Sequence, residues 1–302
     1  MRRTRLLPLA ALLLCTPALT GTAAAGGTHG EGGTVRPLRI LLTNDDGYDA
    51  PGIRMLFQRL TAAGHEVTVV APLTNQSGAG TKLAGGSTVK VVHPGPRVWA
   101  VDGTPGDSVA FGLAAVFGDR APDLVVSGTN FGPNVAALAT HSGTVGGAIA
   151  ALERGVPALA VSTGELAVPV PEQILNAMRP TNDFTVKLID RLRARAGNGR
   201  LLPAGVGLNV NHPVVGADGR GTARGAAITS QDPQPVLAAT YTDTGDGTWK
   251  VAVDLAPAPN RRGGDAEAVT ADKVSIAPIS PDWNTGTVDA ARITLLLGGL
   301  RP

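Results

Sequence analysis

Residues 40–53, ILLTNDDGYDAPGI, contain the features that decide the fold of this chain. The mostly apolar run Arg39–Thr43 predicts a buried strand. Pro51-Gly52 predict entry into a helix over Ile53–Ala63, because proline is favoured in the first turn of a helix. A polar loop with two neighbouring carboxylates lies between them. A buried strand, a loop and a helix in this order are typical of α/β proteins.

The same alternation of apolar runs and helical stretches continues to about Val210. Further strands are expected at His65–Ala71, Val89–Val92, Val98–Val101, Leu124–Val126, Ala158–Ser162 and Val206–Val210, and helices at Asp107–Phe117, Thr144–Arg154 and Glu172–Ala196, the last broken near Pro180. Strands that are apolar throughout and separated by helices indicate a parallel sheet covered by helices on both faces. We therefore expect a Rossmann-like core over residues 38–212, with its ligand beyond the carboxyl ends of the strands.

The pattern changes after residue 212. Thr222–Thr229 and Ala239–Leu255 alternate apolar and polar residues, and the second of these contains the turn signal Asp246-Gly247, so antiparallel hairpins are expected. A final strand is predicted at Lys273–Pro278 and a helix at Val288–Leu297. Residues 213–302 are thus expected to form a C-terminal extension of hairpin and helix.

The N-terminal segment has the pattern of an export signal. Arg2, Arg3 and Arg5 precede the apolar run Leu6–Leu14, and small residues follow. This order predicts a signal peptide over residues 1–25, followed by a flexible leader over 26–37. The predicted location is outside the cytoplasm, secreted or periplasmic.

Composition excludes several classes of site. The full chain has 26 Lys and Arg against 24 Asp and Glu, and residues 1–25 hold three of the arginines and no acid, so the rest is close to neutral. No face for a nucleic acid polymer is indicated. Cys15, the single cysteine, lies in the predicted signal peptide, which excludes disulfides and cysteine nucleophiles from the mature chain. No later segment is long and apolar enough to predict a membrane span.

The first candidate site is Asn44-Asp45-Asp46-Gly47, directly after the first strand. Neighbouring carboxylates repel each other unless a cation lies between them, and Gly47 lets the backbone turn so that both converge. Oxygen ligands of this kind suit Mg²⁺, Mn²⁺ or Ca²⁺ better than zinc. An ordinary turn is the alternative, because Asn, Asp and Gly favour turns anywhere.

Two further polar loops follow predicted strands. Ser77, in the Gly-rich loop after the second strand, offers a hydroxyl for a metal, although the local sequence also fits a mobile surface loop. Asn130 and Asn134 follow Leu124–Val126, and their amides could coordinate a metal or hold a phosphate oxygen. Because all these loops follow buried strands, they are expected to gather at one edge of the sheet.

The start of the helix at Thr144 is a candidate phosphate site. Free backbone N–H groups at Ser142, Gly143 and Thr144 would bind a phosphate well. The alternative for Ser142 and Thr144 is simple N-capping, which needs no ligand. His141 beside them could serve as a general acid, or it is only a partly exposed polar residue.

Seven segments together resemble the SurE family of nucleotidases in order and spacing, over residues 38–282. They are ILLTNDDGYDAPGI (40–53), VVAPLTNQSGAG (69–80), GTPGDSV (103–109), PDLVVSGTNFGPN (122–134), HSGTVGGAIAALERGVPALAVS (141–162), LNVNHP (208–213) and DKVSIAPIS (272–280). The resemblance implies a 5′/3′-nucleotidase or acid phosphatase acting on nucleoside monophosphates or other phosphomonoesters. It also implies a homodimer, or a tetramer, with C-terminal extensions exchanged between subunits or packed on their own core.

The resemblance also implies roles for individual residues. A divalent metal, Mg²⁺ or Mn²⁺ with Ca²⁺ also compatible, would be held by two Asp, a Ser and an Asn. The matching ligands are Asp45, Asp46, Ser77 and Asn130, the two acids also being catalytic, and the phosphate-side contacts are Asn44, Asn134, Ser142, Gly143 and Thr144.

One departure from the family pattern keeps other functions open. Residues 135–141 are VAALATH, where family members usually carry Gly-Asp-Asp and an aromatic residue. An exported nucleotide- or metal-binding protein without significant turnover is therefore the alternative. Residues 63–69 also resemble the start of nucleotide-sugar glycosyltransferases, but those need a second doubly wound half, and the C-terminal pattern does not supply one.

Overall fold

The computed structural model describes residues 36–166, 170–197, 199–256, 261–284 and 286–297. The predicted signal peptide and residues 26–35 of the predicted leader lie outside the described residues. None of the described helices is both long enough and apolar enough to cross a membrane.

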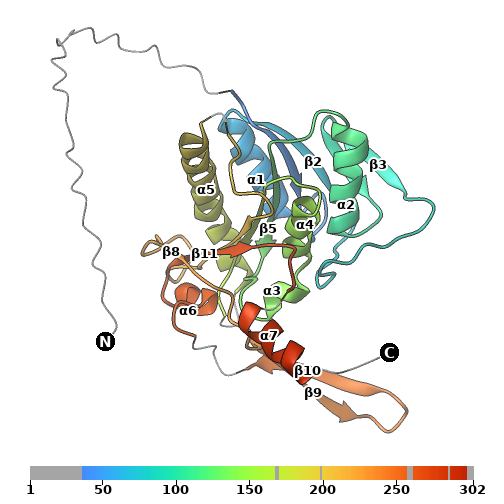
Figure 1. Cartoon of the computed structure of the whole chain (residues 1–302), viewed down its shortest axis with the longest axis vertical. Coiled ribbons are helices and arrows are strands. Elements are labelled where there is room, and N and C mark those ends of the chain that lie inside the picture. Colours follow the sequence, from blue (N-terminus) through green and yellow to red (C-terminus); the bar gives the residue numbers. More distant parts are fainter. Residues whose placement is uncertain (1–35, 167–169, 198, 257–260, 285, 298–302) are drawn as a thin grey trace, which may run out of the picture. The chain divides into compact units, whose positions relative to one another are not determined.

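A nine-stranded, mostly parallel sheet forms the centre of the fold (Figure 1). Its order is β3-β4-β2-β1-β5-β6-β7-β11-β8. The bounds are β1 Arg39–Thr43, β2 Glu66–Pro72, β3 Val91–Gly95, β4 Val98–Val101, β5 Leu124–Phe131, β6 Ala158–Thr163, β7 Gly207–His212, β8 Ala226–Ile228 and β11 Val274–Ile279. The run from β4 through β7 is parallel, so the carboxyl ends of β1, β2, β5, β6 and β7 lie at one edge.

Helices cover both faces of this sheet, as predicted. Helices α1 (Pro51–Ala62) and α5 (Pro171–Ala196) pack together on one face, and α2 (Pro105–Phe111) and α4 (Gly143–Leu152) pack together on the other (Figure 1). The side chains of β1 show why both faces of the sheet need a helical cover. Ile40 and Leu42 join the core on the α1 side, while Leu41 joins the core on the α4 side, because side chains alternate across a strand. The Rossmann-like prediction is confirmed.

Helix α5 is continuous, so the predicted break near Pro180 is wrong. Proline removes one backbone donor and crowds the preceding turn. Here the helix is held from the side: Ile174, Met178 and Ile189 are all at most 1% exposed. Burial of one face therefore outweighs the local cost of the proline.

Strand β5 extends to Phe131, so the predicted end of this strand at Val126, with a polar loop directly after it, is wrong. The strand changes its pairing with β6 between Ser127 and Asn130. Gly128 has φ +145°, and a Cβ there would lie 2.3 Å from the carbonyl oxygen of Val161. Glycine thus lets the strand bend against its neighbour, and Asn130 projects from strand rather than from loop.

Several other predicted elements need correction. The helix expected at Asp107–Phe117 is α2 followed by a π-helix, η1, over Gly112–Phe117. The segment Thr222–Thr229 supplies β8, which is parallel to β11 and belongs to the main sheet, so no antiparallel hairpin forms there. Two short helices, α3 (Leu138–His141) and α6 (Asp265–Thr270), were not predicted.

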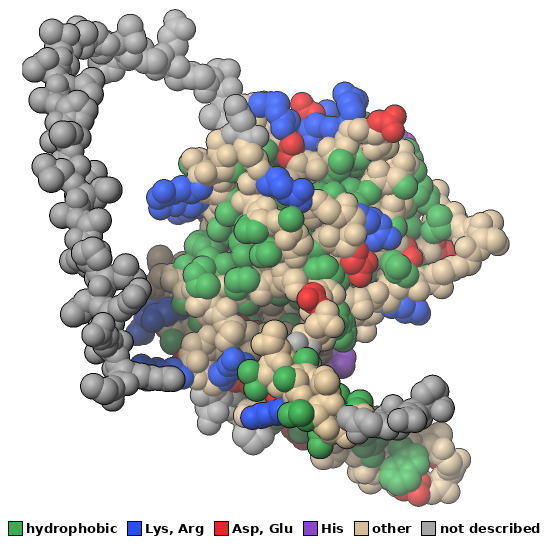
Figure 2. Space-filling view, in the orientation of Figure 1, with side chains coloured by type: hydrophobic (Ala, Val, Ile, Leu, Met, Phe, Trp, Pro, Cys, Tyr) green, Lys and Arg blue, Asp and Glu red, His purple; other side chains and the backbone are tan. Residues whose placement is uncertain are grey.

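The second predicted hairpin is confirmed. Strands β9 (Leu237–Asp243) and β10 (Trp249–Leu255) pair antiparallel around the Asp246-Gly247 turn. Helix α7 spans Thr287–Leu296 and buries none of its residues. Both elements leave apolar side chains open to solvent, and green atoms are visible on the lower part of the face shown in Figure 2. The exposed apolar residues of the two elements are Leu237, Tyr241, Trp249, Val251, Val253, Val288, Ile293, Leu295 and Leu296.

Candidate functional site

Asp45 is the most enclosed member of the predicted site. It lies between β1 and α1 and is 3% exposed. The Thr144 hydroxyl donates a 2.6 Å hydrogen bond to its Oδ1. Burial raises the pKa of Asp45, while the Thr144 hydroxyl and the backbone N–H groups of Thr144 and Gly143 oppose that rise. The first turn of α4 thus faces this carboxylate.

Gly143 is what allows α4 to come so close. A Cβ at this position would lie 2.8 Å from Cβ of Asp45 and 3.2 Å from the carbonyl oxygen of Gln76. A real Cβ essentially never lies as close as 2.8 Å to another heavy atom, so any larger residue would push the helix away. The predicted phosphate turn and the predicted carboxylate loop are therefore in direct contact.

Asp46 lies on the more open side of the same loop. The backbone N–H of Phe131 donates a hydrogen bond of 3.3 Å to its Oδ2. Burial first, and the neighbouring charge of Asp45 second, raise the pKa of Asp46 to about 6. Two adjacent acids that both resist ionisation form a donor set that a divalent cation would stabilise.

The loop after β2 is hydrogen-bonded both to the Asp45 turn and to the residues just before α4. The Gln76 N–H donates to the carbonyl oxygen of Asp45 at 2.7 Å, and the Gly80 N–H donates to the carbonyl oxygen of His141 at 3.1 Å. A Cβ at Gly146 would lie 1.8 Å from the carbonyl oxygen of Gly80. Ser77, exposed in this loop, is consequently held next to the Asp45 turn.

Asn130 and Asn134 occupy different surroundings. The Asn130 amide donates to the carbonyl oxygen of Gly132 at 2.9 Å, which leaves its amide oxygen for a ligand. Asn134 is built into a buried network instead: it donates to Ser162 Oγ at 2.9 Å, and its carbonyl oxygen accepts from Asn209 and Asn211. The structure therefore shows Asn134 within a buried polar network, and its predicted phosphate contact remains a prediction.

Ser142 caps the start of α4, and its predicted phosphate contact stays a prediction. Its hydroxyl oxygen accepts from the Val145 N–H at 3.1 Å, so Ser142 is an N-cap. The Thr144 hydroxyl uses its only proton on Asp45. Asn44 donates to the carbonyl oxygen of Gly47 at 2.8 Å, and its buried Oδ1 has no hydrogen-bond partner. An unpartnered acceptor next to two acids fits a site completed by a cation.

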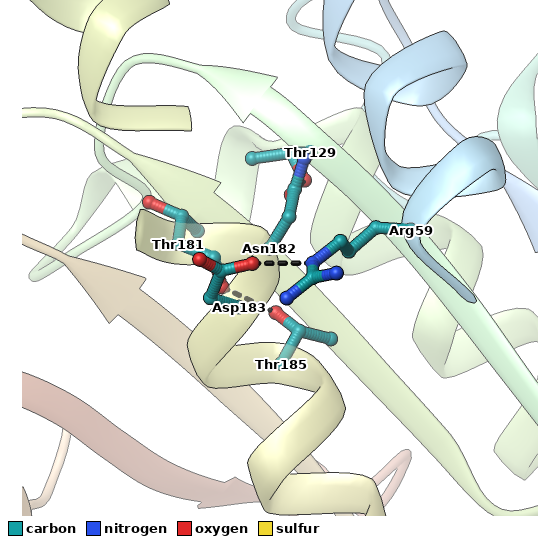
Figure 3. Close-up of polar contacts among 6 residues, drawn as sticks. All are labelled: Arg59, Thr129, Thr181, Asn182, Asp183 and Thr185. Carbon is teal, nitrogen blue, oxygen red and sulfur yellow. Dashed lines mark hydrogen bonds and ion pairs between the residues drawn. The ribbon is translucent and has the colours of Figure 1, made fainter. Parts of the chain in front are cut away.

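A group of polar residues between α5 and the sheet was missed from the sequence. Figure 3 shows Thr129 against Asn182, whose Oδ1 accepts a 2.5 Å hydrogen bond from the Thr129 hydroxyl. A Cβ at Gly52 of α1 would lie 2.0 Å from the Thr129 carbonyl oxygen. Helices α1 and α5 thus fix the residue directly before Asn130. The available signal was a polar residue, Asn182, on the buried face of a predicted helix. The break predicted at Pro180 made that face hard to recognise.

The candidate site contains two carboxylates, Asp45 and Asp46. Among the described residues, no group of three or more His, Cys, Asp or Glu side chains is placed to hold a metal ion. Two acids completed by neutral hydroxyl and amide oxygens are the kind of donor set that hard cations such as Mg²⁺ accept. The residues present therefore fit a divalent metal of that class.

Comparison with known proteins matches residues 40–236 to the family model described as "Survival protein SurE". The chain belongs to the SurE family. Curated relatives support this: a "5'-nucleotidase SurE" of Thermosynechococcus vestitus is 33% identical over 82% of this chain and 93% of its own length. A "5'-nucleotidase SurE 1" of Burkholderia lata is 36% identical over 81% of this chain and 92% of its own.

A solved structure shares the fold. The crystal structure of the SurE protein from Aquifex aeolicus is 30% identical, with a TM-score of 0.70, and covers 85% of this chain and 99% of the other. The predicted resemblance to the SurE family is thereby confirmed. The segments that converge on Asp45 and Asp46 all lie inside the matched region.

Proposed function

We propose that the chain is a metal-dependent phosphomonoesterase that hydrolyses nucleoside monophosphates. Membership of the SurE family and the nucleotidase names of its relatives support a nucleotide phosphomonoesterase. The observation that carries the proposal is the convergence of three segments on one turn. Gln76 contacts the backbone of Asp45, Thr144 contacts its side chain, and Phe131 contacts Asp46.

Asp45, Asp46, Ser77 and Asn130 would hold the metal. A bound divalent ion supplies positive charge to the phosphoryl oxygens and lowers the pKa of a coordinated water. The raised pKa values of the two acids and the free amide oxygen of Asn130 support this assignment.

The chain itself would orient the reacting groups. Asp45 is buried and fixed by Thr144, so its carboxylate has a defined direction, and we propose that it acts as base or nucleophile in the attack on phosphorus. The N-terminus of α4 presents backbone N–H groups and the positive end of the helix dipole, which favour a phosphate nearby. Asn44, Asn134, Ser142, Gly143 and Thr144 are the proposed residues of the phosphate side.

The nucleotidase names of the relatives support 5′-monophosphates as substrates, and we extend the proposal to 3′-monophosphates and simple phosphomonoesters. The test is phosphate release from 5′-AMP, 3′-AMP and p-nitrophenyl phosphate with added Mg²⁺, Mn²⁺ or Ca²⁺, before and after a chelator. Release that stops with the chelator and returns with one ion is expected. Binding of 5′-AMP without any release would favour the alternative of a binding protein.

Secretion and self-association complete the proposal. The basic, apolar and small-residue order of residues 1–25 supports export, and fractionation of cells expressing the full chain tests it. A homodimer is supported by the exposed apolar side chains of β9, β10 and α7, since soluble monomers rarely expose large contiguous apolar patches. Light scattering of the purified protein measures the mass.

A further inference from the structure

A cavity of about 600 Å³ opens along α5, on the face of the sheet that α1 also covers. Its walls come from α5, from Met55 of α1, from His212 at the end of β7, from Val274 of β11 and from residues 220–223, 225 and 226. None of the residues proposed to hold the metal or the phosphate lines it. The volume is in the range of pockets that take small organic ligands.

Three cations line this cavity. They are Arg179 and Lys187 of α5 and Arg220 of the adjoining loop. The acid among the lining residues, Asp183, forms an ion pair with Arg59 (Figure 3). Among the described residues, the side chains of Arg179 and Lys187 make no hydrogen bond or ion pair, and the guanidinium of Arg220 forms no ion pair. The acid nearest to Arg220 in sequence, Asp218, accepts a hydrogen bond of 3.0 Å from the Arg220 backbone N–H. The lining thus holds three cations and one acid, and that acid is already paired with Arg59.

The loop that carries Arg220 is fixed in advance. Gln173 donates to the carbonyl oxygen of Ala217 at 2.8 Å, and Asn176 donates to that of Asp218 at 3.0 Å. Gly219 has φ +74°, and a Cβ there would lie 2.1 Å from the carbonyl oxygen of Gln173. The loop therefore lies too close to α5 for any side chain at this position. Binding therefore loses little entropy in ordering this loop.

The guanidinium of Arg220 is also held in place. Its Nη2 donates to Oδ1 of Asn176 at 3.2 Å. Asn176 is neutral, so this bond orients Arg220 and leaves its charge available. Arg179 and Lys187 are two helical turns apart, about 12 Å along the axis, which separates two positive groups by roughly the length of a small polyanion.

We propose that this cavity binds a small organic polyanion, with phosphate or carboxylate groups held by Arg179, Lys187 and Arg220. Guanidinium groups recognise such oxyanions through paired N–H donors. Leu175, Phe184 and Val274 provide apolar walls for the organic part of the ligand. The site needs no metal and does not depend on the proposed hydrolase activity.

Calorimetric titration of the full chain carrying Asp45→Asn, in the presence of a chelator, tests the proposal, because that background removes binding at the metal site. The probes are pyrophosphate and citrate, which distinguish phosphate from carboxylate groups. Saturable binding of at least one probe is expected, weakening as NaCl rises because the charges are partly exposed.

Variants locate the binding. Arg220→Gln is expected to weaken it about tenfold, as is usual for the loss of one charge-assisted contact. Arg179→Gln, which removes no internal contact, is expected to do the same and guards against misfolding of the loop. Arg191→Gln, on the same helix but outside the cavity, is the matched control. Absence of saturable binding for both probes, or equal weakening by the control, would overturn the site.

Discussion

The hydroxyl of Thr144, at the start of α4, donates a 2.6 Å hydrogen bond to Oδ1 of Asp45, at the end of β1. Ninety-nine residues separate the two along the chain, and neither is more than 3% exposed. This bond ties the candidate phosphate turn to the candidate metal turn, so the geometry of one depends on the other.

Thr144→Val should therefore slow phosphate release without unfolding the protein. The bond lowers the pKa of Asp45, so its loss raises that pKa and frees the carboxylate to move. Loss of one bond to a charged group costs about 1.5–3 kcal/mol, or roughly 10- to 150-fold in kcat/KM. The acidic limb of the pH–rate profile should move to higher pH. Thr144→Ser keeps the donor and should keep the profile; an unchanged rate in Thr144→Val would contradict the positioning role.

Asp45→Asn should abolish turnover while leaving the fold intact. The substitution keeps the shape of the side chain and removes its charge, so it removes both a metal ligand and the proposed base or nucleophile. Phosphate release from 5′-AMP is measured with excess Mn²⁺, and circular dichroism checks the fold. A wild-type rate under excess Mn²⁺ would show that Asp45 has neither role.

Asn182→Leu should weaken metal binding through Asn130. The Thr129 hydroxyl donates to Asn182, and Thr129 directly precedes Asn130 in the bent strand. Replacement leaves a buried hydroxyl unpartnered, which costs about 1–3 kcal/mol of stability. Titration of the purified protein with Mn²⁺ should give a larger Kd. The double substitution Thr129→Val with Asn182→Leu removes both partners and should recover much of the stability but not the metal affinity.

Stability should fall as the pH drops below the ordinary pKa of histidine. Burial, and then the charge of Arg193, lower the pKa of His65 from 6.5, and its two buried ring nitrogens have no hydrogen-bond partner. The unfolded chain thus takes up a proton that the folded chain resists, so stability is full above pH 6.5 and is lost below it. In His65→Leu, the free energy of unfolding measured with urea should depend less steeply on pH between pH 7 and 5. An equally steep dependence in that variant would place its origin elsewhere, for example at His212, whose pKa burial also lowers.

Ile293→Glu with Leu296→Glu should convert the proposed dimer into a folded monomer. Both side chains are more than half exposed on α7. A charge at either position should therefore destabilise the single subunit little, but it should strongly weaken an apolar contact between subunits. Light scattering gives the mass. Ala290→Glu, on the same helix, is a control for added charge. Unaltered mass in the double variant would mean that α7 is not the contact.

The sequence predicted the core because its signals there are local and agree with one another. In β1, β2 and β6, apolar runs end at polar loops, and β-branched residues are common. The same pattern failed at β5, because SGTN resembles a loop, yet Gly128 lets the strand continue past a bend. It failed at Pro180 because the burial that keeps α5 continuous comes from contacts with the sheet and α1, which no local pattern contains.

The sequence pointed to candidate site residues but not to the hydrogen bonds that connect them. The carboxylate turn, the Ser77 loop and the start of α4 stand out because each follows a strand or opens a helix. Asn182, Asn209 and Asn211 were missed because a polar residue inside a strand or helix gives no sign of its partner. Their importance appears only where distant segments meet.

The buried amide network around Asn134 should be insensitive to pH. Asn134, Asn209, Asn211 and Ser162 carry no ionisable group, so acidity cannot alter the bonds among them. These bonds join the segment after β5 to β6 and β7 through neutral dipoles alone. Protonation of the acidic turn therefore leaves the spacing between these three segments unchanged.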